Sequence, residues 1–236
     1  MTAGDQPPCT DGSAQRLDPR RLRQRMTEAL TRQGLGDAAV LAAMAEVPRH
    51  LFADEALTAR AYDLATLPIG KGQTMSNPCT VARMTTLLQL SPGMTVLEIG
   101  TGSGYQAAVL ATMGCRVYTA ERLPELYERT RDLLRRLGYT DIVPMLGDGT
   151  LGCPKMAPFA RIIVTASGPA IPGPLIEQLD EGGIMVIPVG ESGSQRLKRV
   201  FKKAGRLYEQ DCGPAAFVDL VGDHGWQAAS CQTPHY

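Results

Sequence analysis

The chain has 236 residues with equal numbers of basic and acidic side chains, 24 of each, and no formal net charge. This length fits one large domain or a domain with appendages, and the balanced charge excludes a general attraction to nucleic acid or to an anionic membrane. No apolar run approaches the roughly 20 residues of a membrane span, and the polar N-terminus lacks the apolar segment of a secretory signal.

The first predicted elements are two helices behind a polar tail. Residues 1–17 are rich in Pro, Gly, Ser, Thr and Asp, which predicts a disordered tail. Asp18 has the character of an N-cap for a helix that runs to Gly34, and a second helix is expected from residue 37 to 47. Residues 48–75 show no long periodic pattern, so we expect a layer rich in coil.

A glycine-rich loop then leads into a third helix. Asn77 is expected to cap this helix with Pro78 at its first position, and apolar residues continue at helical spacing to the turn at residues 91–93. Ser76 therefore lies directly before a helix N-terminus. Two interpretations stay open from the spacing: a serine with a local capping role, or a hydroxyl used in catalysis.

From residue 94 onward, strands and helices alternate, which predicts a mostly parallel, doubly wound sheet. An antiparallel hairpin is expected at its C-terminal edge, followed by a last strand. The expected strands are 95–100, 116–121, 141–146, 161–166 and 183–189, the helices 105–113, 124–137 and 172–180, the hairpin strands 197–201 and 206–208, and the last strand 217–221. The chain thus divides into a cap (18–93), an α/β core (94–222) and a tail (223–236) of unreadable role.

Three glycines at alternate positions follow the first strand of this core. In the run 96–106, Gly100, Gly102 and Gly104 form a tight turn between an apolar strand and an apolar helix. Such a turn brings backbone N–H groups at a helix N-terminus close to a polar ligand, and a ligand that carries adenosine is the obvious class. A turn of this kind also occurs without any ligand.

Acidic residues follow the next two strands. Glu121 ends a strand 21 residues after Gly100, where a carboxylate can accept hydrogen bonds from a ribose diol. In isolation a solvated strand-end glutamate is the plainer interpretation, but the glycine turn upstream favours the ribose. Asp148 lies between two glycines, where it serves either simple turn chemistry or a bond to the amine of adenine.

The glycine spacing helps to distinguish between two cofactors. A nicotinamide cofactor calls for G-x-G-x-x-G and usually for a second nucleotide-binding half, whereas this chain has G-x-G-x-G and a sheet that ends in a hairpin. S-adenosyl-L-methionine has no pyrophosphate and needs only a turn, an acid for the ribose and a polar group for the adenine. The sequence favours S-adenosyl-L-methionine.

Two stretches resemble a known family. The run 67–76, LPIGKGQTMS, and the run 96–106, VLEIGTGSGYQ, closely resemble the protein-L-isoaspartate O-methyltransferase family, and residues 147–149, 161–166 and 182–190 extend the likeness over about residues 20 to 222. The glycine turn alone indicates only some methyltransferase, whereas G-Q-T-x-S is specific to this family. The resemblance implies a Rossmann-like methyltransferase fold and a protein-repair enzyme. Such an enzyme methylates the α-carboxylate of L-isoaspartyl residues and releases S-adenosyl-L-homocysteine.

The resemblance also assigns roles to residues. Ser76 matches the active-site serine, Glu121 the ribose ligand and Asp148 the adenine contact. Cofactor contacts are expected at Gly100, Thr101, Gly102, Ser103, Glu121, Arg122, Asp148 and Gly149, and substrate-positioning roles at Gln73, Thr74, Thr165 and Ala166. An ionised carboxylate with a pKa of about 4 needs no general base, so the hypothesis is that the Ser76 hydroxyl orients it while the 67–76 loop folds over the cofactor.

Several positions depart from the family pattern and leave the substrate preference open. Lys71 replaces a frequent histidine, Ala160 a frequent acid, and the pair Ala215 and Ala216 a basic residue. Methylation of another peptide carboxylate, or a non-catalytic module that binds S-adenosyl-L-methionine, are the alternatives. Partners are expected to be damaged proteins and peptides, with no nucleic acid and no membrane.

The positions of the cysteines and histidines bear on the redox compartment and on metal binding. Six scattered cysteines form no C-x-x-C pair and the three histidines are far apart in sequence, which predicts reduced thiols, a cytoplasmic protein and no metal site. A monomer is expected, although the sequence does not decide the oligomeric state.

Overall fold

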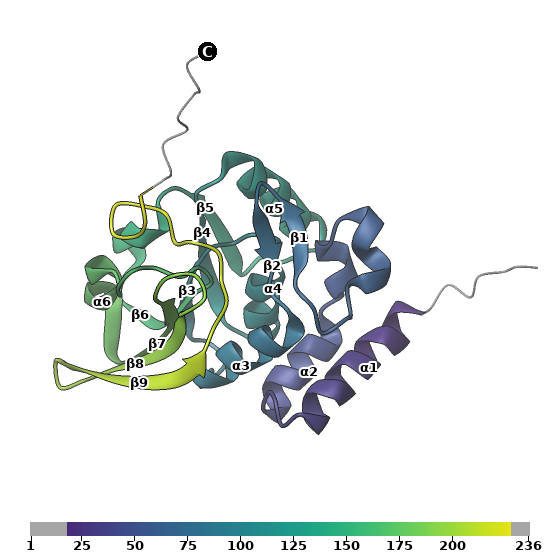
Figure 1. The fold of residues 1–236 in the computed structure, drawn as a ribbon, viewed down its shortest axis with the longest axis horizontal. Coiled ribbons are helices and arrows are strands. Elements are labelled where there is room, and N and C mark those ends of the chain that lie inside the picture. Colours follow the sequence, from purple (N-terminus) through teal and green to yellow (C-terminus); the bar gives the residue numbers. More distant parts are fainter. Residues whose placement is uncertain (1–17, 228–236) are drawn as a thin grey trace, which may run out of the picture.

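The computed structural model describes residues 18–227, and a central sheet with helices around it dominates this part of the chain (Figure 1). The predicted tail 1–17 and residues 228–236 of the predicted C-terminal tail lie outside the described residues. No helix between residues 18 and 227 has the length and apolar character to cross a bilayer.

The N-terminal helices form where the sequence predicts them. Helix α1 (Pro19–Arg32) starts behind Asp18, whose carboxylate accepts a hydrogen bond from the N–H of Arg20 at 3.0 Å. Helix α2 (Ala38–Glu46) starts behind Asp37, which accepts from the N–H of Val40 at 2.9 Å. Two short 3₁₀ helices, Arg49–Phe52 and Glu55–Arg60, occupy part of the coil-rich layer.

The glycine-rich loop is more ordered than the sequence predicts, because it forms an antiparallel hairpin. Strand β1 (Leu67–Gly70) pairs with β2 (Gln73–Met75) across a turn at Lys71 and Gly72. Pro68 and the two glycines resemble loop residues, which hid the hairpin. The hairpin contacts a helix of the core, since the guanidinium of Arg129 donates to the Ile69 carbonyl at 2.8 Å.

Helix α3 (Pro78–Leu88) follows the hairpin with the predicted cap. The Asn77 side-chain oxygen accepts a hydrogen bond from the N–H of Thr80 at 2.8 Å. The helix ends at Gln89, which takes a left-handed conformation. Ser76 is therefore fixed between β2 and the first turn of α3.

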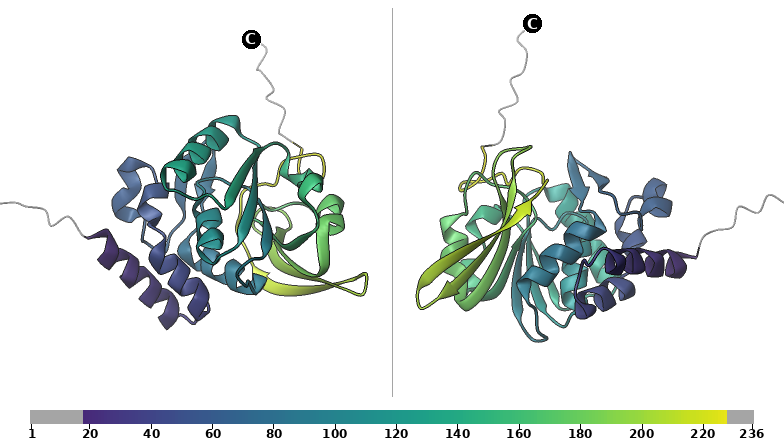
Figure 2. Two further views of the ribbon diagram at one scale, coloured as in Figure 1. Left: turned by 180° about the vertical axis from the view of Figure 1, so that it is seen from behind. Right: turned by 60° about the horizontal axis from the view of Figure 1, so that its bottom comes forward.

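The sheet has seven strands in the order β5-β4-β3-β6-β7-β8-β9, parallel from β5 to β7 and antiparallel beyond (Figures 1 and 2). Its direction of growth reverses between β3 and β6, and in open parallel sheets ligands bind at this switch point beyond the carboxyl ends of the strands. The remaining elements are β3 (Thr95–Ile99), α4 (Tyr105–Thr112), β4 (Arg116–Glu121), α5 (Pro124–Arg136), β5 (Ile142–Leu146), β6 (Phe159–Val164), α6 (Gly173–Gln178), β7 (Leu179–Val189), β8 (Arg196–Lys203) and β9 (Arg206–Pro214).

Alternate residues of the strands point into two hydrophobic clusters. Val96 belongs to the cluster that also holds apolar residues of α1 to α5, whereas its neighbour Leu97 belongs to the cluster that holds Leu175 of α6. This alternation places the sheet between two apolar layers, as the period of two in a strand requires.

The predicted last strand, 217–221, is wrong. Within residues 217–221 the pairing is limited to two isolated bridges, from Asp219 to Ser167 and from Val221 to Trp226. The Gln195 side chain occupies both backbone groups of Phe217, because its oxygen accepts from the N–H at 2.6 Å and its NH₂ donates to the carbonyl at 3.0 Å. A side chain thus replaces the neighbouring strand at this point.

Candidate active site

The glycine turn lies at the switch point of the sheet, directly after β3. Gly100 has a φ of 95°, and a Cβ at this position would collide with the Thr165 hydroxyl, which donates to the carbonyls of Ile99 (3.0 Å) and Gly100 (2.9 Å). Gly104 has a φ of 86°, and a Cβ there would lie 2.7 Å from the Thr130 methyl group of α5. The first glycine therefore serves the approach of β6, and the third serves the packing of α5.

Glu121 ends β4 beside this turn and is only 6% exposed. One carboxylate oxygen accepts from the N–H of Gly102 at 2.9 Å and the other from the N–H of Leu123 at 3.0 Å. An ionised carboxylate offers about four acceptor sites, so two remain for a ligand. Because Glu121 also lines the pocket at the turn, its remaining sites fit a ribose diol.

A second acidic residue, Glu98, is connected to the glycine turn through two threonine hydroxyls. Glu98 of β3 is fully buried, and burial raises the pKa of its carboxyl group to about 8. The Thr119 hydroxyl donates to Glu98 at 2.6 Å, and the hydroxyls of Thr119 and Thr101 lie 2.7 Å apart. This chain of side chains links β3 and β4 to Thr101 in the glycine turn.

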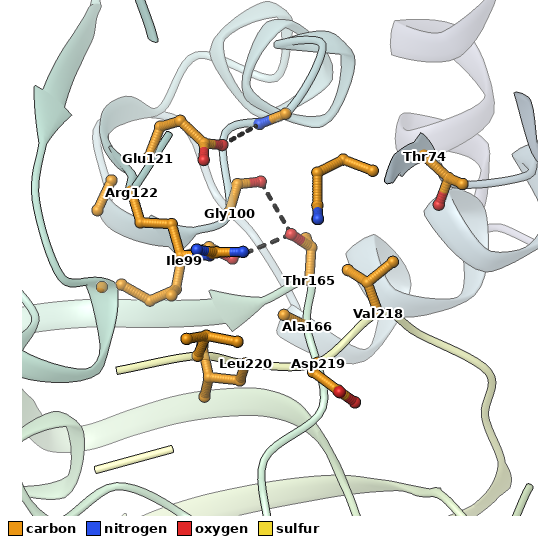
Figure 3. Close-up of a pocket in the computed structure, with 15 residues that line it drawn as sticks. Thr74, Ile99, Gly100, Glu121, Arg122, Thr165, Ala166, Val218, Asp219 and Leu220 are labelled. Atoms are coloured by element: carbon orange, nitrogen blue, oxygen red, sulfur yellow. Dashed lines mark hydrogen bonds between the residues drawn. The ribbon is translucent and has the colours of Figure 1, made fainter. Parts of the chain in front are cut away.

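The main pocket lies where the predicted cofactor residues meet (Figure 3). In the close-up, Glu121 and Arg122 lie on one side, Thr74 lies on the other, and Gly100 and Thr165 lie between them. The pocket brings together nine of the predicted site residues, namely Gln73, Thr74, Gly100, Gly102, Glu121, Arg122, Gly149, Thr165 and Ala166. Residues 218–221 also line it, although their apolar pattern predicts a strand and not the wall of a pocket.

Asp148 is placed differently from these residues. Its carboxylate accepts from the N–H and hydroxyl of Thr150, at 2.8 and 2.7 Å, and from the N–H of Asp223 at 2.8 Å. Burial by itself would raise its pKa, but these hydrogen bonds hold the pKa below its usual value. Asp148 does not line the main pocket, although Gly149 does. Its contact with adenine stays a prediction.

The hydrogen bond from Asp223 ties Asp148 to a segment that we call the C-terminal clasp, residues 217–226. The Trp226 indole N–H donates to the Ser167 carbonyl at 2.8 Å, and its backbone N–H donates to the Leu220 carbonyl at 2.7 Å. Because residues 218–221 line the main pocket, the clasp forms one of its walls.

Ser76 lies on two further cavities. The serine cavity is lined by Ser76 and by Thr101, Gly102 and Ser103 of the glycine turn. The outer cavity is lined by Ser76, Asn77, Thr80, Phe217 and others. Thr74 and Thr165 line both of these cavities and the main pocket as well. The three spaces therefore meet at these two threonines, next to Ser76.

A buried arginine fixes the backbone of Ser76. Arg49 is 0% exposed and donates to the Ser76 carbonyl at 2.7 Å and to the Ala61 carbonyl at 2.8 Å. Its guanidinium carbon lies 4.5 Å from the centre of the Tyr105 ring, and Tyr105 lines the serine cavity. Sequence reasoning missed Arg49, although a cation between the apolar residues Val47 and Leu51 was a signal to follow.

The comparison with protein families decides the identity of this site. The sequence model of the family "Protein-L-isoaspartate(D-aspartate) O-methyltransferase" matches residues 21–225, which is most of the chain. The chain belongs to this family. The resemblance that the two glycine-containing stretches indicated is therefore confirmed.

Similar proteins agree with this membership. A protein-L-isoaspartate O-methyltransferase of Magnetococcus marinus is 51% identical over 88% of this chain and 91% of its own length. One from Methanoculleus marisnigri is 49% identical over 89% of this chain and 96% of its own. Among solved structures, a Plasmodium falciparum protein described as a putative member, in complex with S-adenosyl-L-homocysteine, has a TM-score of 0.75 and 25% identity, over 84% of this chain and 98% of that one.

The family and the geometry agree on the fold and the cofactor. The Rossmann-like fold is confirmed, and the cofactor of the family is S-adenosyl-L-methionine. The pocket fits this group because it is lined by Gly100 and Gly102 of the turn, and because Glu121 beside them keeps acceptor sites for the ribose.

Proposed function

We infer that this chain is a protein-repair methyltransferase, which transfers a methyl group from S-adenosyl-L-methionine to the α-carboxylate of L-isoaspartyl residues in damaged proteins and peptides. Family membership over residues 21–225 supports this reaction. The observation that carries it in the structure is the position of Ser76, on both the serine cavity and the outer cavity. A peptide carboxylate that enters through the outer cavity reaches the serine beside the glycine turn.

For this reaction the main task of the protein is to align the carboxylate with the methyl group. S-adenosyl-L-methionine supplies a methyl group that is electrophilic because the sulfur carries a positive charge. A carboxylate is ionised at neutral pH and attacks without a general base, since its pKa is about 4. The side chains therefore need only to hold the carboxylate in line and exclude water.

We propose that the Ser76 hydroxyl orients the incoming carboxylate. No hydrogen bond between described residues engages this hydroxyl, so it can donate to a substrate, while Arg49 holds the Ser76 carbonyl. Thr74 and Thr165 are proposed to position the substrate, because they line the spaces that meet there. Gln73 and Ala166 are proposed to border the same junction.

The deciding experiment compares paired peptides. With tritiated S-adenosyl-L-methionine, we expect methylation of an isoaspartyl peptide and none of the identical peptide with normal aspartate. Equal methylation of both peptides would favour an enzyme for another carboxylate. Binding of the cofactor without methylation of any peptide would favour a non-catalytic module.

The role of Ser76 has its own test. In Ser76→Ala, we expect kcat/KM for the isoaspartyl peptide to fall by about tenfold, the effect of one lost orienting hydrogen bond of 1–1.5 kcal/mol. The affinity for S-adenosyl-L-homocysteine is measured in parallel. An unchanged kcat/KM would remove the serine from the mechanism.

We further propose a cytoplasmic monomer that acts without nucleic acid. The zero net charge gives no general attraction to nucleic acid, and cysteines without paired motifs fit a reducing compartment. Light scattering of the purified chain, with and without added RNA, tests the monomer and the lack of nucleic-acid binding.

A further inference from the structure

A groove beside helix α3 contains Arg83, which forms no ion pair with an acid among residues 18–227. This Arg83 groove is lined by Asn77, Thr80 and Arg83 at α3, and by Leu197, Pro214 and Phe217 from the hairpin edge and the clasp. It encloses about 330 Å³, which is enough for a long side chain. None of the residues that line this groove also lines the main pocket.

The groove continues the outer cavity. Asn77, Thr80 and Phe217 line both spaces, and Ser76 lines the outer cavity. A peptide whose modified residue reaches Ser76 therefore has the Arg83 groove as a direct path for its neighbouring residues.

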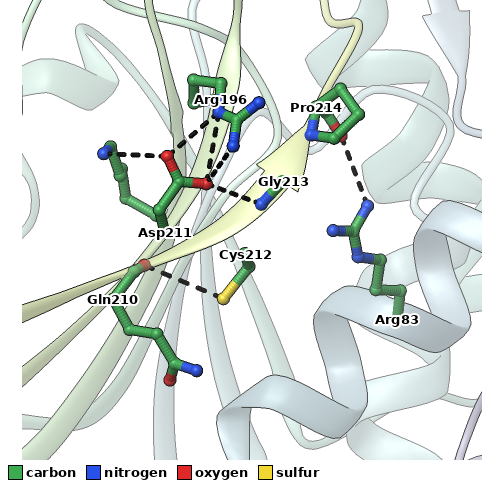
Figure 4. Close-up of polar contacts among 8 residues, drawn as sticks. Arg83, Arg196, Gln210, Asp211, Cys212, Gly213 and Pro214 are labelled. Carbon is green, nitrogen blue, oxygen red and sulfur yellow. Dashed lines mark hydrogen bonds and ion pairs between the residues drawn. The ribbon is translucent and has the colours of Figure 1, made fainter.

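Arg83 gives the groove a positive charge. Arg83 donates to the Pro214 carbonyl at 3.3 Å, and it belongs to none of the ion pairs between residues 18 and 227 (Figure 4). Asp211 is the acid drawn nearby, but its carboxylate lies 2.9 Å from Arg196 and 3.4 Å from Lys198. Its negative charge is therefore already matched and does not neutralise Arg83.

The distance along α3 fixes which substrate residue meets Arg83. From Asn77 to Arg83 the helix advances by six residues, or about 9 Å. An extended peptide advances about 3.3 Å per residue, so this span corresponds to two or three peptide residues.

We propose that the Arg83 groove is a peptide subsite that binds the carboxylate of an aspartate or glutamate two or three residues from the isoaspartyl residue. The subsite rests on the proposed function. It makes this enzyme select damaged sites in acidic sequence surroundings, because a lysine in the groove faces a cation and a glutamine lacks the charge.

The test uses isoaspartyl peptides that differ at one position. Glu, Gln or Lys is placed two or three residues from the modified residue, on the N-terminal side in one series and on the C-terminal side in another. We measure kcat/KM, and also peptide binding by fluorescence anisotropy with S-adenosyl-L-homocysteine present. The ratio between peptides is internal to each protein, so a partial loss of folded enzyme cancels.

For the wild type we expect a Glu-to-Gln ratio of about two to five on one flank, the range of a solvent-accessible ion pair. Arg83→Gln should bring this ratio close to one, and Arg83→Glu should favour the Lys peptide. The control Arg136→Gln makes the same change on the exposed end of α5 and should keep the wild-type ratio. The preference should weaken at about 0.5 M salt, where screening is strong.

The proposal fails if the wild type and Arg83→Gln show the same ratios on both flanks. It also fails if Arg136→Gln alters the ratio as much as Arg83→Gln does. Absence of methylation of every peptide would count against the proposed function, whereas the anisotropy ratios would still decide the subsite.

Discussion

At the scale of single residues, Arg49 is the least expected part of the site. It is a buried cation whose hydrogen-bond partners are two backbone carbonyls, one of them on Ser76. Lysine keeps the charge but lacks the planar fork that donates to both carbonyls. Arg49 is therefore a positioning residue, which acts on the substrate only through the backbone of the serine.

The first prediction concerns Arg49→Lys. One buried carbonyl is left unpaired, so the free energy of unfolding should fall by about 1–3 kcal/mol. We expect kcat to fall about tenfold, with little change in the KM for S-adenosyl-L-methionine, because Glu121 and the glycine turn are untouched. Steady-state kinetics and urea unfolding measure both effects. Arg60→Lys, on an exposed 3₁₀ helix, is the control, and equal kinetics for the two variants would contradict the role.

The second prediction concerns the pH dependence of stability through Glu98. Its carboxyl has a pKa of about 8 in the folded protein against an ordinary 4.5, because it is fully buried. The folded state thus keeps a proton that the unfolded chain releases. Stability from this group is complete below pH 4.5 and is lost as the pH rises toward 8, by about 1.4 kcal/mol per pH unit.

Glu98→Gln removes this titration and keeps an oxygen that accepts from Thr119. The variant should therefore gain stability relative to the wild type at each step from pH 5 to pH 8. Urea unfolding at four pH values, with both proteins side by side, gives the difference in unfolding free energy. A difference that stays constant over this range would show that Glu98 keeps an ordinary pKa.

At the scale of elements, the C-terminal clasp separates two explanations of Asp148. The sequence predicts a contact with adenine, whereas the structure shows Asp148 holding the N–H of Asp223. Trp226→Phe removes the indole bond to Ser167 and leaves Asp148 in place. If the clasp is what matters, Asp148→Asn and Trp226→Phe should weaken cofactor binding to a similar extent.

The expected loss is about five- to tenfold in affinity for S-adenosyl-L-homocysteine, since each variant removes about 1 kcal/mol of hydrogen bonding from a wall of the pocket. Calorimetric titration measures the affinity, and hydrogen exchange of residues 218–226 reports the opening of the clasp. Weaker binding in Asp148→Asn alone, with exchange unchanged, would favour the direct contact with adenine.

Several elements could be predicted from the sequence alone. The caps at Asp18, Asp37 and Asn77, and the turn at Gly100, were predictable because each depends on residues close together in the chain. The resemblance to the family then led to Ser76 and Glu121. Local sequence patterns thus suffice to predict the helix caps, the glycine turn and these two site residues.

What the sequence could not predict depends on contacts between distant residues. The Gln195 side chain, 22 residues from Phe217, takes the place of a strand partner and makes 217–221 a pocket wall instead of a strand. The bonds from Arg49 to Ser76 and from Asp148 to Asp223 span 27 and 75 residues. No periodic pattern records such pairings.

At the scale of the whole molecule, the N-terminal layer and the sheet share one core. Met26 and Leu30 of α1 lie in the same buried cluster as Val96 and Val117 of the sheet. The division into a cap at 18–93 and a core at 94–222 was inferred from the sequence pattern and stays a prediction. In the described residues, the apolar face of the sheet depends on the helices that precede it.

This shared cluster predicts a single cooperative unfolding transition. Neither part can expose its side of the cluster without uncovering the other, so calorimetry should give one peak with equal calorimetric and van't Hoff enthalpies. S-adenosyl-L-homocysteine at 100 times its Kd should stabilise the folded state by about 2.7 kcal/mol. For a chain of this size, that shift moves the whole peak upward by about 5–10 °C. Two peaks, of which only one moves with the ligand, would show that the N-terminal layer unfolds independently of the cofactor-binding sheet.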